Sequence, residues 1–120
     1  MKIMPQEIDV WYVLPALRKE IAKAWIKKHK LKQKECAKIF GITEAAVSQY
    51  MTSKRADEIS FSKEELKIIK EYADKIIKDK KSVHKHLYAL CRKVHATGNI
   101  CKLHRKKDGE VPHKCDLCMK

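Results

Sequence analysis

The sequence predicts an all-α fold, and three features of the 120-residue chain carry that prediction. First, LKQKECAKIFGITEAAVSQY over residues 31–50 has the pattern of two short helices joined by a tight turn. Second, a helix start at residue 62 opens a long run of apolar residues at helical spacing. Third, four cysteines lie in the last thirty residues, which hold too little apolar surface to fold unaided. Together these features predict a helix-turn-helix bundle over residues 1–60, a helical arm over 61–90 and a small metal-stapled C-terminal module over 91–120.

Two helices are expected between residues 33 and 51. The first, Gln33–Phe40, carries its apolar residues on one stripe, and Gly41 would end it because glycine adopts a positive φ without steric strain. Thr43 is a favourable N-cap for a second helix that starts at Glu44, since its hydroxyl can accept a backbone N–H. Val47 would anchor this second helix in the core.

The other face of the second helix carries short or amide side chains. Such a face lets the backbone lie deep in a DNA major groove while hydrogen-bonding groups meet base edges. Two cations directly after the helix are placed for phosphates beside the groove. The candidate base-facing residues are Thr43, Glu44, Ala45, Ser48 and Gln49, and the two cations are Lys54 and Arg55.

This segment resembles the helix-turn-helix of the Cro and phage-repressor (XRE-type) family. Ala37 stands where the helices cross, Gly41 four residues later in the turn, and Val47 six after that in the core. The resemblance implies that the second helix enters the major groove while the first lies across the backbone, with Gln33 and Lys34 near phosphates. It also implies a homodimer, because one recognition helix covers only a half-site. Helical hairpins that never touch DNA also carry Ala, Gly and Val at such positions. The small polar face of the second helix and the positive charge favour DNA binding over that alternative.

A second resemblance covers nearly the whole chain. The stretch VLPALRKEIAKAW over residues 13–25, together with the C-terminal cysteine cluster, is similar to a group of small archaeal predicted transcription regulators. The resemblance implies a role in transcription regulation and says little about ligand or target genes.

The composition favours a polyanionic partner. Lys and Arg outnumber Asp and Glu 28 to 15, which gives a net charge of +13 and a pI near 9.6. Such an excess favours nucleic acid through counterion release, although a lysine-rich proteome could account for part of it. The N-terminus has no long apolar run, which predicts a cytoplasmic protein without a signal peptide or membrane span. The chain leaves little room for a deep catalytic cleft, so an enzyme is not expected, and no small-molecule substrate is indicated.

Before the helix-turn-helix segment, a short helix is expected over residues 1–13. Pro15 would break or kink it and is also a favourable first residue for a scaffold helix that runs to about His29. A capping box of Ser62 and Glu65 then starts the arm. Its apolar residues alternate at spacings of three and four, which suits either a partner helix of a second subunit or the cover of its own domain. The polar run 78–82 could break this helix in two. The seam consists of Leu66, Ile69, Ala73, Ile76, Val83, Leu87, Leu90 and Val94.

The C-terminal cysteines predict a metal site, since Cys-x2-Cys in a cytoplasmic chain favours metal over disulfides. Two ligand sets fit. Four thiolates, Cys91, Cys101, Cys115 and Cys118, could hold zinc or an iron–sulfur cluster. Alternatively, Cys101 and His104 pair with Cys115 and Cys118 in a zinc site that leaves Cys91 out. Zinc and iron–sulfur both remain open, and an unliganded redox pair is the alternative to metal.

The leading hypothesis is a sequence-specific regulator that binds double-stranded DNA as a homodimer and whose metal or cluster tunes or stabilises it. The alternative is a transcription bridging or coactivator protein with a purely structural zinc module. A redox enzyme built on the Cys-x2-Cys is a third hypothesis, without a substrate-pocket signature to support it.

Overall fold

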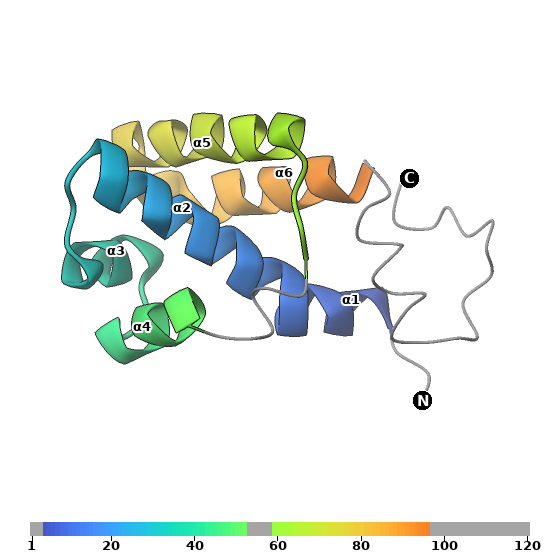
Figure 1. The fold of residues 1–120 in the computed structure, drawn as a ribbon, viewed down its shortest axis with the longest axis horizontal. Helices are drawn as coiled ribbons and strands as arrows, with labels where there is room; N and C mark the ends of the chain where they lie inside the picture. Colours follow the sequence, from blue (N-terminus) through green and yellow to red (C-terminus); the bar gives the residue numbers. More distant parts are fainter. Residues whose placement is uncertain (1–3, 53–58, 97–120) are drawn as a thin grey trace.

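The computed structural model describes residues 4–52 and 59–96, and every regular element in these ranges is helical (Figure 1). The all-α prediction is therefore confirmed for the described part of the chain. The elements in order are α1 (Pro5–Ile8), a π-helical turn (Asp9–Val13), α2 (Leu14–Lys28), α3 (Gln33–Phe40), α4 (Glu44–Thr52), α5 (Lys63–Lys78), a 3-10 turn (Lys80–Ser82) and α6 (Val83–Ala96). None of the helices in these ranges is long and apolar enough to cross a membrane.

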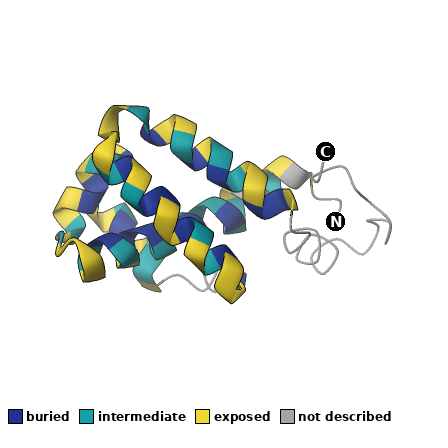
Figure 2. Cartoon of the chain, turned by 90° about the horizontal axis from the view of Figure 1, so that it is seen from above, coloured by how far each residue is buried: buried dark blue, intermediate teal, exposed yellow. Residues whose placement is uncertain are grey.

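α2 is the helix on which the others are assembled. It packs against α5 on one side and against α3 and α4 on the other, while α6 packs against α5 (Figure 1). The buried side chains of α2 to α6 form one hydrophobic cluster, and exposed positions follow the outer helix faces (Figure 2). The predicted scaffold role of the helix that ends near His29 is therefore confirmed, since α2 ends at Lys28 with His29 as C-cap.

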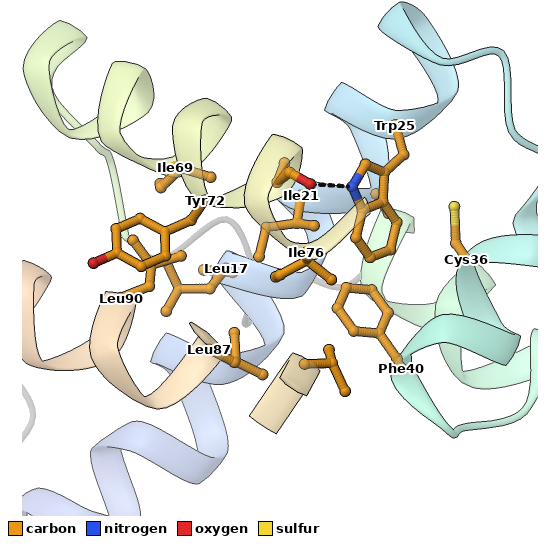
Figure 3. Packing of buried hydrophobic residues seen from close by; sticks show 14 of the residues in the cluster. Leu17, Ile21, Trp25, Cys36, Phe40, Ile69, Tyr72, Ile76, Leu87 and Leu90 are labelled. Carbon is orange, nitrogen blue, oxygen red and sulfur yellow. Dashed lines mark hydrogen bonds between the residues drawn. The ribbon is translucent and has the colours of Figure 1, made fainter. Parts of the chain in front are cut away.

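Trp25 of α2 joins three helices. Its side chain is fully buried, and its ring centroid lies 4.9 Å from that of Phe40 in α3. Its indole Nε1 donates a hydrogen bond of 2.9 Å to the backbone carbonyl of Ala73 in α5 (Figure 3). A buried indole N–H requires such a partner, because leaving it unpaired away from water is costly. One side chain thus fixes the position of α3 and α5 relative to α2.

Pro15 lies in the first turn of α2, as predicted for a proline that opens a helix, but no break precedes it. The chain does not break there, since Val13 directly before α2 keeps right-handed helical dihedrals (φ −70°, ψ −53°). Instead, a π-helical turn over Asp9–Val13 leads from α1 into α2. Proline lacks an N–H and its ring crowds the carbonyl four residues earlier, and a wider turn relieves both effects. The helical path therefore continues through Pro15.

The heptad-spaced seam of α5 and α6 is buried inside its own chain. Leu66 is partly buried, and the other seam residues are 0–7% exposed within the common core. Of the two uses open to such a stripe, covering its own domain is the one observed. Residues 78–82 do break the helix as expected, since α5 ends at Lys78 and α6 begins at Val83.

The start of α5 is capped as the sequence predicts. The backbone N–H of Glu65 donates to the Ser62 hydroxyl at 3.2 Å, and the backbone N–H of Ser62 donates to Glu65 Oε1 at 3.0 Å. This reciprocal pair satisfies two backbone donors that the first turn would otherwise leave without partners. The cap fixes where α5 begins and hence which of its residues face α2.

Asp74 of α5 ties down the C-terminal end of α2. Its carboxylate accepts from Lys28 Nζ at 2.7 Å and lies 3.0 Å from His29 Nε2. The hydrogen bonds from Lys28 and His29, in that order, hold the pKa of the Asp74 carboxyl below its usual value. The carboxylate therefore stays ionised near neutral pH and keeps the two helix ends together.

Candidate nucleic-acid interface

The connection between α3 and α4 is a tight, fully hydrogen-bonded turn. Gly41 has φ +74° and ψ +32°, in the left-handed region. Its N–H bonds the carbonyl of Lys38 at 3.3 Å, and the N–H of Ile42 bonds the carbonyl of Ala37 at 3.0 Å. This pair of bonds is the Schellman pattern, which closes a helix around a left-handed residue. The positive φ predicted for Gly41 is confirmed.

α4 starts where the sequence places it. The backbone N–H of Ala46 donates to the Thr43 hydroxyl at 3.1 Å, so Thr43 acts as the predicted N-cap. Val47 is 1% exposed and holds the helix in the core. Three residues therefore suffice to turn the chain from α3 into α4, and both ends of the turn are fixed by local hydrogen bonds.

Two substitutions at left-handed residues should change stability in opposite directions. Gly41→Ala should lower the free energy of unfolding by about 1 kcal/mol, because a side chain at positive φ is strained. An added Cβ there meets nothing within 4 Å, so backbone strain alone accounts for the loss. Lys30, between α2 and α3, has φ +56°, and Lys30→Gly should raise stability by roughly 0.5 kcal/mol. Urea denaturation followed by circular dichroism measures the free energy of unfolding of both variants. A lower stability of Lys30→Gly would contradict the left-handed backbone at Lys30.

The residues expected to face bases lie together on the exposed side of the α3–α4 pair (residues 33–52). Val47 on the opposite side of α4 is buried, so the helix presents one face to solvent and one to the core. Of the two residues expected near phosphates, Lys34 is exposed and Gln33 is half-buried at the start of α3. The exposed candidates are Thr43, Glu44, Ala45, Ser48 and Gln49.

Three of these polar side chains, Glu44, Ser48 and Gln49, have no side-chain partner within residues 4–52 and 59–96. The Thr43 hydroxyl already accepts from Ala46, and the Thr52 hydroxyl donates to the Ser48 carbonyl at 3.2 Å. The face therefore offers one carboxylate, one hydroxyl and one amide, beside two threonine hydroxyls that are engaged with the helix backbone.

A contact between α2 and α4, which the sequence does not reveal, holds α4 against the scaffold helix. Arg18 of α2 donates from Nη1 to the hydroxyl of Tyr50 at 2.9 Å, and its guanidinium carbon lies 5.6 Å from the ring centroid. The two residues are 32 positions apart, and Arg18 looks from its sequence position like part of a solvated basic face. The pair couples the orientation of α4 to α2.

Cys36 is part of the hydrophobic core. It is fully buried among apolar residues, as expected for a cysteine that serves as a small hydrophobic residue. Burial, with the neighbouring Glu35 carboxylate adding to it, raises the pKa of the Cys36 thiol. The thiol therefore stays protonated at neutral pH and is a poor nucleophile or metal ligand.

Several predicted site residues lie outside the described ranges. They are the phosphate candidates Lys54 and Arg55 and the metal-ligand candidates Cys101, His104, Cys115 and Cys118. Cys91, the fifth candidate ligand, is half-buried in α6. Residues 4–52 and 59–96 contain no cluster of three or more His, Cys, Asp or Glu side chains that could hold a metal ion.

Comparison with known proteins leaves the geometry as the main guide: no family model, curated protein or solved structure matches the chain.

Proposed function

We propose that the protein is a sequence-specific regulator of transcription that binds double-stranded DNA, with α3 and α4 as a helix-turn-helix and α4 as its reading helix. The observation that carries this proposal is the exposed face of α4, which is small and polar while its opposite face is anchored by buried Val47. A helix of that kind can enter a major groove without steric obstruction. The net charge of +13 supplies the attraction to the phosphate backbone.

The chemistry of each side chain suggests its role at the bases. The Gln49 amide can form a bidentate pair with adenine N6 and N7, and the Ser48 hydroxyl can donate or accept. The Glu44 carboxylate can accept from cytosine N4, and Ala45 can contact a thymine methyl. Lys34, together with Lys54 and Arg55, would meet phosphates beside the groove. Specificity would therefore come from α4 and affinity from the cations around it.

The proposal includes a homodimer, because one α4 covers only a half-site. The seam of α5 and α6 is buried by its own chain, so the subunits would meet through another surface. Three large apolar side chains are exposed in the described ranges, Met4, Val10 and Tyr88. Sedimentation equilibrium with and without DNA measures the stoichiometry.

Binding-site selection from random DNA tests the proposal directly. Selection should enrich one sequence, and Gln49→Ala should then weaken binding to it by about 1–3 kcal/mol while leaving random DNA almost unaffected. The control is Lys34→Ala, which should weaken all sequences alike and reduce the salt slope by about 1. Fluorescence anisotropy at several salt concentrations measures both.

Two results would contradict this assignment. Equal losses on all sequences for Gln49→Ala and Lys34→Ala would remove the base-reading role of α4. A selection that enriches no sequence, combined with tight binding to a protein of the transcription machinery, would favour a bridging or coactivator role instead.

We further propose that the C-terminal cysteines hold zinc or an iron–sulfur cluster that stabilises or tunes the regulator. Four thiolates can ligate either, whereas a set with His104 fits zinc. Anaerobic purification followed by an absorption spectrum and analysis for zinc, iron and sulfide should find metal bound to the chain. Iron and sulfide would make the cluster a redox-responsive element, and zinc a structural one. Protein purified without either, and with unchanged thermal stability after chelation, would contradict the metal site.

A further inference from the structure

One end of the molecule gathers lysines that the α4 face does not use. The connection from α2 to α3 and the turn from α5 to α6 both lie at this end (Figure 1). Each carries a cluster of exposed lysines, and the two clusters are about fifty residues apart in sequence. We call this set the lysine end. It consists of Lys27, Lys30 and Lys32 at or after the end of α2, and of Lys78, Lys80, Lys81 and Lys85 from the end of α5 to the first turn of α6.

The fold holds these two clusters together through Asp74. The carboxylate bonds Lys28 and His29 at the end of α2 (2.7 and 3.0 Å), and α5 ends at Lys78, one helical turn later. Lys30 follows the anchored residues of α2, and Lys80 and Lys81 follow the end of α5. The packing of α2 on α5, with Asp74 linking the two helices, therefore places both clusters at one end of the molecule.

The seven lysines of the lysine end outnumber the two carboxylates described beside them, Asp74 and Asp79, so this end carries an excess of positive charge. Asp74 pairs with Lys28 and His29, and Asp79 lies 3.3 Å from His86 Nε2. Lys30, Lys80 and Lys81 form no ion pair within residues 4–52 and 59–96. Exposed like charges without counter-charges repel one another and lower the stability of the compact state, which is offset when a polyanion binds them.

We propose that the lysine end binds the phosphate backbone of the DNA duplex next to the segment that α4 reads. This rests on the proposed function, because it uses the same duplex. Lys30 and Lys32 lead directly into Gln33 and Lys34, the proposed phosphate contacts at the start of α3. The lysine end thus continues that contact away from α4 towards the turn between α5 and α6. Its lysines would add affinity on any sequence, because phosphates occur at every step of the duplex.

A pair of matched triple variants tests this inference. Lys30→Gln, Lys80→Gln and Lys81→Gln together remove three charges from the lysine end. The control combines Lys63→Gln, Lys67→Gln and Lys70→Gln, which removes three exposed charges from the opposite half of α5. The probe is a 30-base-pair duplex of random sequence, with binding followed by fluorescence anisotropy between 50 and 200 mM KCl. Thermal melting of both variants checks that they remain folded.

The lysine-end variant should lose more affinity than the control. Each lost phosphate contact makes the negative slope of log K against log salt less steep by about 0.9. If the contact contributes nothing at 1 M salt, this equals about an eightfold loss of affinity at 0.1 M. We expect at least one such contact from the three lysines, and little change in the control. A lower slope in the lysine-end variant alone would support the inference.

The remaining outcomes separate the two proposals. Equal slopes and affinities for both variants, with tight binding by the wild type, would overturn the role of the lysine end and leave the proposed function standing. If the lysine-end variant lost affinity for an A-form RNA duplex and kept its affinity for DNA, the proposed DNA contact would be overturned in favour of RNA. A wild type that does not bind duplex DNA at 50 mM KCl would overturn both.

Discussion

Trp25→Ala should lower the free energy of unfolding by about 4 kcal/mol. The side chain is fully buried, so its removal leaves a large cavity where α2, α3 and α5 meet. The ring also stacks near Phe40 with 4.9 Å between centroids, and its N–H satisfies the carbonyl of Ala73 at 2.9 Å. The loss therefore combines apolar burial, an aromatic contact and a buried hydrogen bond. Denaturation in guanidinium chloride, followed by circular dichroism, measures it.

Two further variants isolate the terms and guard against complete unfolding. Trp25→Phe keeps an aromatic ring beside Phe40 and removes the N–H donor, so it should cost less than Trp25→Ala. Trp11→Ala serves as the control, because Trp11 is only half-buried and packs at the margin of the core. A Trp11→Ala loss as large as that of Trp25→Ala would show that Trp25 is not the joint between the helices.

Ala37→Leu should lower the free energy of unfolding by about 2 kcal/mol and abolish DNA binding even in the folded protein. Ala37 is 4% exposed in the last turn of α3, and its carbonyl accepts the hydrogen bond that closes the turn. A leucine there must displace neighbouring side chains or tilt α3 against α4. On the proposed function, a changed angle between these helices moves the reading face out of the groove.

Ala45→Leu is the matched control for Ala37→Leu, since it makes the same change on the exposed face of α4. Its effect on stability should lie within about 0.5 kcal/mol, as for most surface substitutions. Affinity for the selected DNA should fall, because the added bulk lies where the groove floor would be. Chemical denaturation and anisotropy measurements on both variants give the comparison. Unchanged DNA affinity in Ala45→Leu would argue against α4 as the reading helix.

Features determined by neighbouring residues were predictable from the sequence. The bends at Gly41, the cap at Thr43 and the reciprocal cap of Ser62 and Glu65 all depend on residues within five positions of one another. Local sequence sets φ and the available hydrogen-bond partners, so pattern and structure agree there. The α3–α4 pair therefore has the helix bounds that the sequence indicates.

Features determined by distant residues were not predictable in the same way. The bond from Arg18 to Tyr50 spans 32 positions, and that from Trp25 to Ala73 spans 48. Neither hydrogen bond produces a periodic pattern in the sequence, because each depends on the angle at which the helices cross. The seam of α5 and α6 was ambiguous for the same reason, since burial against α2 and burial against a second subunit require the same spacing. Pro15 correctly marked the start of α2, but the sequence did not show that a π-helical turn would lead into it in place of a break.

The pairing of α2 with α5 also bears on how the chain folds. Its hydrogen bonds close a loop of 45 to 48 residues, and the whole α3–α4 pair lies inside that loop. Closing a flexible loop of this length costs roughly 3 kcal/mol of chain entropy, so folding should be slower than in a bundle whose helices pair only in sequence order. The amides of α2 and α5 should therefore gain protection from hydrogen exchange together, once these two helices have docked. The protection of α2 would thus report on the docking of a helix that begins eleven residues after α4 ends.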